Sequence, residues 1–262
     1  MTPDKAIARL TKAEAKLIRS LAMKKRRDET GLFIAEGPKV VSELLRYFPC
    51  RMVVVTEEID TPYYNKETNA HLRQATPDEL RSLSLLQTPQ HVIGVFEKPD
   101  IGASTSGETG FSLAIALDGI QDPGNLGTIL RTADWLNIRA VYASPDTADC
   151  YAPKVVQATA GALGRVQVEY CDLPTLLTQM KKRGVTVCGT FMQGENLYQT
   201  STHEPAIIVM GNEGNGIRPD VETLCDKRLA IPRYTPRDDS GESLNVAVAA
   251  AIVCAELRRR GG

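Results

Sequence analysis

The sequence predicts an α/β protein in which a parallel sheet is covered by helices and a smaller α/β unit precedes it. From residue 111 onward, short and almost continuously apolar runs alternate with segments of helical periodicity, a pattern typical of parallel strands buried on both faces. The segment PDIGASTSGETG (99–110) is rich in Gly, Ser and Thr, which suits a flexible connector. We therefore expect a first domain at 1–98, a linker at 99–110 and a second domain at 111–262.

The first domain shows alternating helix and strand signals of a small α/β unit. Its helix starts are marked by Thr11 with Glu14, by Pro38, and by TPDEL (76–80). The first of these helices is basic, covers about 12–28, and can be ended by Gly31. The predicted strands are LFIAEG (32–37), MVVVT (52–56) and HVIGVFEK (91–98).

The second domain alternates more strictly. Its predicted strands are FSLAIAL (111–117), AVYAS (140–144), VQVEY (166–170), VTVCGTFM (185–192), AIIVMG (206–211) and RLAIP (228–232). Its predicted helices lie at about 126–137, 152–163, 173–183 and 243–259. Because helices separate most of these strands, the strands are expected to run parallel.

Charge is balanced over the whole chain and uneven at its start. The formal net charge is −1, so no overall field selects a partner. Residues 1–31 carry nine Lys or Arg against four Asp or Glu, a net of +5, with KKRR at 24–27. Such a segment can bind a polyanion, although charge alone is more often explained by a solvated helix face.

Cysteine and apolar patterns argue against a metal site and a membrane span. The six cysteines include no CxxC pair, and His71, His91 and His203 stand apart from them, so no zinc site is expected. Scattered cysteines in apolar surroundings indicate reduced thiols and a cytoplasmic protein. The N-terminus has no apolar signal region. The longest apolar run (246–255) is also shorter than the roughly 20 residues that a span needs.

Polar loops follow the predicted strands that end at 117, 211 and 232, and open α/β sheets bind ligands beyond such carboxyl ends. In the first loop, DGIQDPGNLGTILRTADWL, Asn125 can cap the helix, and Arg131 falls outside the apolar stripe. A helix start disfavours a cation, so Arg131 does not serve the helix dipole. An ion pair with Asp134, or plain solvation, would explain Arg131 equally well.

The other two loops have similar features. GNEGNGI (211–217) is most simply a tight turn, but its Glu213 would repel phosphate, so the loop suits a cation or hydroxyl groups. In SLNVAVAAAIVCAELRRR, Ser243 can cap a helix and Asn245 lies in its first turn; capping alone would explain Ser243. The sequence contains no GxxxxGK[ST], no GxGxxG after a strand and no GxSxG. A P-loop, a Rossmann dinucleotide site and a serine hydrolase are therefore disfavoured.

Together, NLGTILRTA, VMGNEGNGI and AIP followed by SLNVAVAAAI resemble the three ordered motifs of the SpoU (TrmH-like) RNA 2′-O-ribose methyltransferases of the SPOUT superfamily. APKVVQATAGAL (152–163) resembles the segment between the first two motifs, and residues 19–45 resemble the start of the N-terminal substrate-binding domain. The resemblance covers nearly the whole chain. It implies a C-terminal parallel-sheet SPOUT domain with a deep trefoil knot, and a small N-terminal α/β domain, like ribosomal protein L30e, that binds RNA.

The resemblance also implies an activity: methyl transfer from S-adenosylmethionine to a ribose 2′-hydroxyl of rRNA or tRNA, in a homodimer with the active site at the subunit interface. Matching positions imply that the cofactor is contacted by Gly211, Ile231 and Leu244, with Thr190 as a weaker candidate. The polar catalytic and RNA-contacting positions match Asn125, Arg131, Glu213, Ser243 and Asn245. The basic N-terminal helix is expected to bind RNA through Lys24, Lys25, Arg26 and Arg27.

Two questions stay open at this level. The loop RYTPRDDSGE (233–242) is longer than the family's compact loop, which puts the placement of Ser243 in doubt. Arg131 matches the family's proposed base, although arginine ordinarily stays protonated. It could be neutral in a desolvated site, or it could stay charged and stabilise the developing alkoxide while phosphate or water takes the proton; we favour the second route. The alternative function is an RNA-binding assembly factor of the same fold without turnover, and a nucleotide-binding protein without methyl chemistry is disfavoured by the missing phosphate loop.

Overall fold

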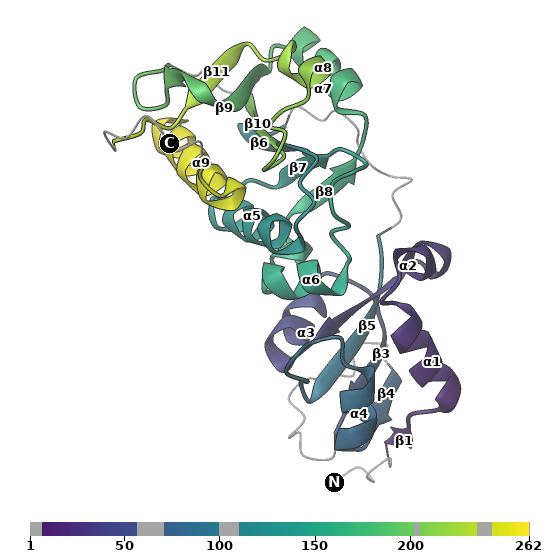
Figure 1. The fold of residues 1–262 in the computed structure, drawn as a ribbon. Helices are drawn as coiled ribbons and strands as arrows, with labels where there is room; N and C mark the ends of the chain where they lie inside the picture. Colours follow the sequence, from purple (N-terminus) through teal and green to yellow (C-terminus); the bar gives the residue numbers. More distant parts are fainter. Residues whose placement is uncertain (1–6, 57–70, 100–109, 202–204, 235–242, 262) are drawn as a thin grey trace. The chain divides into compact units, whose positions relative to one another are not determined.

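The computed structural model describes residues 7–56, 71–99, 110–201, 205–234 and 243–261 (Figure 1). Most of the predicted linker (99–110) lies outside the described residues. Contacts divide the chain into two compact units. The first unit comprises Met1–Ile101 and Asp149–Gly164, and the second unit comprises Gly102–Ala148 and Arg165–Gly262. The chain therefore passes between the units three times.

The first unit contains a five-stranded sheet of order β1-β4-β3-β5-β2. Its strands are β1 (Ala8–Arg9), β2 (Leu32–Glu36), β3 (Cys50–Val55), β4 (His71–Gln74) and β5 (Val92–Glu97). Strand β5 is antiparallel to both of its neighbours, whereas β1, β4 and β3 run parallel. Strands β2, β3 and β5 confirm the three predicted strands. Strands β1 and β4 were not predicted, because they are short and not fully buried.

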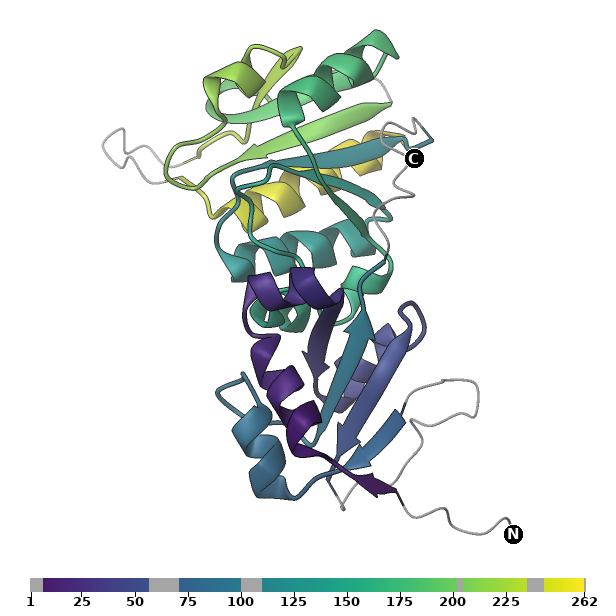
Figure 2. The same cartoon turned by 90° about the vertical axis from the view of Figure 1, so that its right-hand side faces the viewer.

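Helices cover both faces of this sheet. Helices α1 (Lys12–Ser20) and α4 (Pro77–Leu83) share an apolar cluster with one face, and α3 (Pro38–Leu44) covers the other (Figure 2). Both predicted capping boxes are present, at the starts of α1 and α4. The single basic helix predicted over 12–28 is wrong, because the chain breaks after Ser20 and resumes as α2 (Lys24–Thr30). Gly31 ends α2 with a φ of 64°, as predicted for a terminating glycine.

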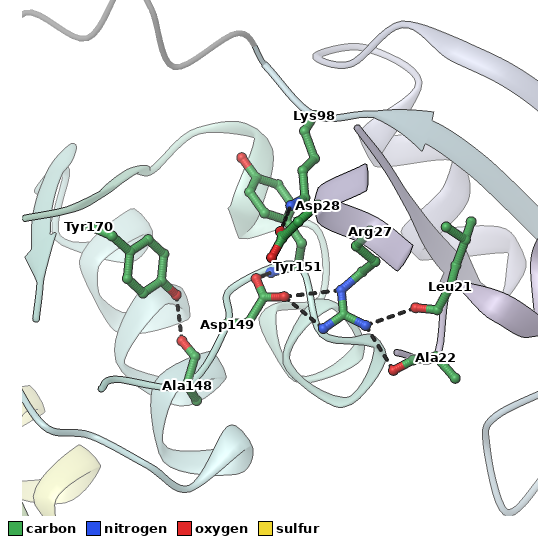
Figure 3. Close-up of polar contacts among 9 residues, drawn as sticks. All are labelled: Leu21, Ala22, Arg27, Asp28, Lys98, Ala148, Asp149, Tyr151 and Tyr170. Atoms are coloured by element: carbon green, nitrogen blue, oxygen red, sulfur yellow. Dashed lines mark hydrogen bonds and ion pairs between the residues drawn. The ribbon is translucent and has the colours of Figure 1, made fainter. Parts of the chain in front are cut away.

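A buried arginine stabilises the break between α1 and α2 (Figure 3). The guanidinium of Arg27 donates to the carbonyls of Leu21 and Ala22, at 2.8 and 2.9 Å, just beyond the end of α1. Its Nε and Nη2 atoms also donate to Asp149 Oδ2, at 3.0 and 2.7 Å. Carbonyls at a helix end lack intrahelical partners and need such donors. Arg27 therefore joins the α1–α2 corner to a segment more than a hundred residues away.

The segment Asp149–Gly164 carries α6 (Pro153–Thr159) and the short 3₁₀ helix η2 (Ala162–Gly164), which pack on β2 and α3. The Tyr151 ring lies 4.9 Å from the ring of Phe33, and the Nζ atom of Lys98 lies 5.3 Å above its centre. At Gly161, where φ is +95°, an added Cβ would lie 2.8 Å from the Cβ of Glu43. The close approach of α3 therefore requires glycine at this position.

The second unit contains a six-stranded sheet of order β11-β9-β10-β6-β7-β8, in which every neighbouring pair is parallel. Its strands are β6 (Leu113–Asp118), β7 (Ala140–Ala143), β8 (Gln167–Tyr170), β9 (Thr186–Asn196), β10 (Ala206–Gly211) and β11 (Lys227–Ala230). All six predicted strands and the parallel sheet are confirmed. Strand β9 extends beyond its predicted end, because β11 pairs with both of its halves across a register shift.

Helices α5 (Pro123–Trp135) and α9 (Val246–Gly261) cover one face of this sheet, and α7 (Leu173–Lys182) and α8 (Pro219–Glu222) cover the other (Figure 2). Leu177 and Met180 of α7 pack with Val187 and Ile207 of the sheet in one apolar cluster. The four-residue helix α8 was not predicted. Among the described residues, no helix has the length and apolarity that a membrane span requires.

Helices α5 and α9 run side by side in the same direction. At their starts, Asn245 Nδ2 donates to Asn125 Oδ1 at 2.9 Å. At their ends, the guanidinium of Arg258 donates to the carbonyls of Leu136 and Asn137, both at 3.0 Å. A cation is favourable at a helix C-terminus, so Arg258 stabilises the end of α5. The two helices consequently begin at the same edge of the sheet.

Candidate active site

The loops that carry the three motifs meet at the carboxyl edge of the six-stranded sheet. Asp118, the last residue of β6, pairs in register with Gly211, the last residue of β10. The loops that follow these strands therefore start next to each other. Helix α9 begins beside α5, which follows β6, and so adds the third motif. As predicted, the three segments converge, around Asn125, Glu213 and Asn245.

A chain of side-chain hydrogen bonds connects these three residues. Asn125 Nδ2 donates to Glu213 Oε1 at 2.5 Å, and Asn125 Oδ1 accepts from Asn245 Nδ2. Asn245 Oδ1 accepts the peptide N–H groups of Ala247 and Val248, at 3.0 and 3.3 Å. Since an amide has distinct donor and acceptor ends, these contacts fix the orientation of both asparagines.

The helix caps differ from the prediction. Asp122 caps α5 in place of Asn125, because its Oδ1 atom accepts the peptide N–H of Asn125 at 2.7 Å. Pro123 suits the first helical position and starts α5 three residues earlier than expected. Asn245 directly precedes α9 and caps it, whereas the prediction gave that role to Ser243. Both predicted asparagines are thus part of the site. Asn125 lies within α5, and Asn245 lies one residue before α9.

The glycine-rich loop 211–217 is a tight turn, as predicted. Asn212 and Gly216 exchange two backbone hydrogen bonds of 3.0 and 2.9 Å. The side-chain oxygen of Asn212 accepts two further peptide N–H groups within the turn. An added Cβ on Gly211 would lie 2.4 Å from the carbonyl carbon of Gly216, so the turn itself requires glycine there. Glu213 is exposed and reaches Asn125 from this turn.

The side chain of Arg131 is exposed on α5, and it has no hydrogen bond or ion pair with any described residue. Of the two alternative explanations of Arg131, the ion pair with Asp134 does not form, because Arg165 holds Asp134 through two contacts of 2.8 Å. Trp135, one turn further along α5, is 89% exposed. The guanidinium of Arg131 therefore faces solvent beside an apolar side chain.

The residues at the base of the glycine-rich loop were missed in the sequence. Asp118 has a fully buried side chain and pairs with Arg218 at 2.7 Å. Asn212 Nδ2 donates to the carbonyl of Gly119 at 2.7 Å. An aspartate that directly follows the apolar run FSLAIAL was the available signal for the first of these contacts.

The predicted cofactor residues lie at different places in the second unit. Gly211 ends β10, Ile231 directly follows β11, and both are partly exposed. Leu244 is 52% exposed before α9. Thr190 lies inside β9 and not at its end, because the strand continues beside β11. Its hydroxyl donates to the carbonyl of Val209 at 2.9 Å, which leaves the oxygen free only to accept.

Ser243 lies apart from the amide network. It is exposed, and it has no hydrogen bond with another residue in the described part of the chain. Most of the long loop before it, residues 235–242, lies outside the described residues. Asn245 thus reaches the site through a defined contact, and Ser243 does not.

The basic quartet of the first unit divides into exposed and buried members. Lys24 and Lys25 are exposed, and Arg26 is partly exposed and pairs with Glu29. Arg27 is only 3% exposed, and its donors are occupied by two carbonyls and Asp149. The structure therefore corrects the prediction for Arg27, whose guanidinium is inaccessible to RNA.

Four of the six thiols are unsuited to nucleophilic catalysis. No disulfide joins any of the six cysteines, all of which lie in the described ranges. Burial raises the pKa of Cys50, Cys171 and Cys254 to about 12, and that of Cys225 to about 11. Thiols with such pKa values stay protonated at neutral pH. In the described ranges, no group of three or more His, Cys, Asp or Glu side chains is arranged to hold a metal ion.

Known proteins are similar to this chain in sequence and in fold. The profile of the SpoU rRNA Methylase family matches residues 112–255, and that of the MRM3-like substrate binding domain matches residues 12–94. The chain is 32% identical to the 23S rRNA (guanosine(2553)-2′-O)-methyltransferase RlmP of Bacillus subtilis, over 92% of this chain and 94% of that protein.

Two solved structures extend the comparison. A protein of Porphyromonas gingivalis, described as a TrmH-family RNA methyltransferase, is 40% identical, with a TM-score of 0.83 over 97% of this chain and 100% of that one. An AdoMet-bound rRNA methyltransferase from Sinorhizobium meliloti is 27% identical, with a TM-score of 0.83 over 97% of each chain. The family profile spans more than half of the chain and includes the whole Asn125–Glu213–Asn245 network. The chain therefore belongs to the SpoU rRNA Methylase family.

Proposed function

We propose that this chain is an S-adenosylmethionine-dependent RNA methyltransferase that modifies a ribose 2′-hydroxyl of rRNA. The observation that carries the proposal is the exposed Arg131 on the helix whose first turn joins the Asn125–Glu213–Asn245 network. The similarity to RlmP along nearly the whole chain favours rRNA over tRNA as the substrate class.

The residues at the carboxyl edge fit S-adenosylmethionine. Partly exposed Ile231 and exposed Leu244 offer apolar surface for a heterocycle next to backbone groups at strand ends. Glu213 offers a carboxylate that suits a sulfonium or ribose hydroxyls and would repel a phosphate. We assign the cofactor to Gly211, Ile231 and Leu244, with Thr190 as a further acceptor.

Arg131 is proposed to act as a charged group. When bound, the cofactor supplies a methyl group attached to a sulfonium, and the sulfonium leaves as a neutral thioether. The ribose oxygen gains this methyl group and loses its proton, so the developing negative charge needs a positive neighbour. Arginine ordinarily keeps its proton, so we assign Arg131 the role of a charged group and not that of a base. Its fork can contact the ribose oxygen and a neighbouring phosphate, while phosphate or water accepts the proton.

Asn125, Glu213 and Asn245 are proposed to set the shape of the site. Their hydrogen-bonded chain links the starts of α5 and α9 to the glycine-rich loop. A fixed geometry lowers the entropic cost of bringing the hydroxyl and the methyl group together. Ser243 is proposed as an RNA-contacting residue, since it is exposed two residues before Asn245.

The first unit is proposed to be an RNA-binding domain of the ribosomal protein L30e kind. Its support is the match to a substrate-binding domain profile and the exposed Lys24 and Lys25, with Arg26 beside them. RNA is contacted largely through its phosphates, which such cations suit.

We also propose the deep trefoil knot of the SPOUT superfamily. Strand β11 lies at one edge of the sheet, yet α9, which follows it, returns to pack along α5. A C-terminal segment tucked through an earlier loop would have this course.

A cytoplasmic homodimer with the site at the subunit interface completes the proposal. Trp135 (89% exposed), Leu244 and Val248 (49% exposed) present apolar surface on or just before the helices that carry the site. Such surface is commonly covered by a partner. The lack of disulfides among the described cysteines agrees with a reducing compartment.

The full chain, incubated with methyl-labelled S-adenosylmethionine and unmodified 23S rRNA or tRNA transcripts, tests the proposal. We expect label in rRNA, at a single 2′-oxygen located by nuclease digestion. Label on a base, or in tRNA alone, would contradict the proposal. RNA binding without any transfer would instead support the assembly-factor alternative.

A further inference from the structure

The base of the glycine-rich loop is closed by a buried carboxylate. Asp118 Oδ2 accepts the peptide N–H of Arg218 at 2.7 Å, and Asp118 Oδ1 accepts Arg218 Nε at 2.7 Å. The Asp118 side chain is 0% exposed, whereas that of Arg218 is 44% exposed. Arg218 therefore donates to both carboxylate oxygens of Asp118, once through its backbone and once through its side chain.

A second contact lies beside the first. The loop leaves β10 at Gly211, which pairs in register with Asp118, and returns to β6 at Arg218. Asn212 Nδ2 donates to the carbonyl of Gly119 at 2.7 Å. Both ends of the loop are thus attached to Asp118 and Gly119, and Glu213 between them reaches Asn125.

We propose that Asp118 and Arg218 are positioning residues. They hold loop 211–217 in the position in which Glu213 accepts the hydrogen bond of Asn125. The expected effect on methyl transfer rests on the proposed function, whereas the expected effect on the position of the loop rests on the hydrogen bonds alone. Burying a carboxylate against a half-exposed arginine adds little stability compared with an apolar pair. Two directional hydrogen bonds to one residue do fix the register of the loop on β6.

The test compares Asp118→Asn and Arg218→Lys with the wild-type full chain. The Asp118→Asn change keeps the size of the side chain but turns an NH₂ group toward one of the two donors, so one of the two hydrogen bonds is broken. The Arg218→Lys change keeps the charge and the peptide N–H but removes the Nε donor. Arg81→Gln, which breaks an exposed ion pair with Asp78, is the control.

Hydrogen exchange of peptides covering 211–217 gives a readout that needs no activity. We expect Asp118→Asn to speed exchange in this loop roughly ten- to hundredfold, the equilibrium factor for removing one charge-assisted hydrogen bond. Exchange in α7 should stay unchanged, Arg218→Lys should lie between Asp118→Asn and the wild type, and Arg81→Gln should match the wild type. Unchanged exchange in loop 211–217 would overturn the proposal even if the protein proves not to be a methyltransferase.

Binding and single-turnover measurements supply the second readout. With S-adenosylmethionine as the probe, we expect Asp118→Asn to raise the dissociation constant about tenfold and to slow methyl transfer at saturating cofactor. A lower melting temperature, with exchange in loop 211–217, cofactor affinity and transfer rate all at wild-type values, would show a merely structural role and overturn the assignment.

Discussion

At the scale of single residues, the proposed chemistry depends on an exposed guanidinium on the helix whose first turn joins a hydrogen-bonded network. Arg131→Lys keeps a positive charge but loses the planar fork that can contact two oxygens at once. We expect methyl transfer to fall about a hundredfold, the effect of removing one donor from a developing oxyanion, with cofactor affinity unchanged.

Single-turnover rates and calorimetric titration with S-adenosylmethionine measure the two quantities. Arg183→Lys, at an exposed position after α7, should behave as the wild type. Turnover near the wild-type rate in Arg131→Lys would show that charge alone suffices.

The exposed lysines of α2 should contribute to RNA affinity without affecting stability. Replacing Lys24 and Lys25 by Gln is expected to weaken RNA binding and to reduce the slope of log affinity against log salt by about one for each phosphate that is no longer neutralised. Filter binding at several salt concentrations measures this slope, and Lys182→Gln in the second unit is the control. An unaltered slope would remove these lysines from the RNA-binding surface.

Arg27 should behave in the opposite way. Arg27→Gln leaves Asp149 buried without its counterion and two carbonyls without donors, so we expect a loss of about 3–5 kcal/mol in the free energy of unfolding of the first unit. Adding Asp149→Asn should restore part of this loss. Urea unfolding followed by circular dichroism measures both variants, and equal stability of Arg27→Gln and the wild type would exclude the buried role.

The contrast within KKRR shows what the residue pattern could and could not predict. The four cations are adjacent in the sequence, and only the fold distinguishes Arg27, whose carboxylate partner lies 122 positions away. Asn125, Glu213 and Asn245 could be predicted because each stands in a motif with its own local signal. Asp118 had only the weak signal of an aspartate directly after an apolar run, and its partner Arg218 could not be predicted, because the pairing depends on the loop that returns from β10.

At the scale of elements, α9 contains a carboxylate whose charge is tied to stability. Hydrogen bonds from Arg259 lower the pKa of Glu256 from 4.5 to about 2, and Arg260 contributes a further bond. A lowered pKa in the folded state means that this stabilisation is present above pH 4.5 and is lost as the pH falls toward 2. Glu256→Gln should therefore destabilise the protein at about pH 6, and the difference from the wild type should shrink below pH 4.5.

Thermal unfolding at about pH 6 and at several values below 4.5 tests this dependence. Glu195→Gln, at an exposed glutamate of β9, is the control. A difference between Glu256→Gln and the wild type that does not vary with pH would contradict the assignment.

Elements with strong periodicity could be predicted, whereas short or polar ones could not. Most strands of the second unit contain an apolar run, and β8 alternates apolar with polar residues, so the parallel sheet followed from the sequence. The second half of β9 has no such run, because Gln193, Gly194 and Glu195 are exposed, so the sequence pattern carries no signal of its pairing with β11. The break between α1 and α2 was missed, since both segments favour helix and the break depends on the tertiary contact of Arg27.

At the scale of the whole molecule, the first unit is built from two separate parts of the chain. Residues Asp149–Gly164 supply α6, the Tyr151 ring against Phe33 and the carboxylate for Arg27. The sequence pattern assigned this segment to the second domain, because it lies between two strands of the second sheet. Its apolar residues carried no sign of which sheet they would cover.

This organisation makes the fragment 111–262 an incomplete domain. Without residues 1–98, helix α6 loses its packing on β2, Tyr151 loses the ring of Phe33, and Asp149 loses its counterion. We therefore expect amide protection in 149–164 to disappear in this fragment, while protection in β6 and β10 persists, as measured by hydrogen exchange. Cleavage of the full chain within 99–110 should leave protection in 149–164 intact, because the described contacts of that segment are made with Phe33, Arg27, β2 and α3. Retained protection of 149–164 in the isolated fragment would show that the segment folds with the second unit alone.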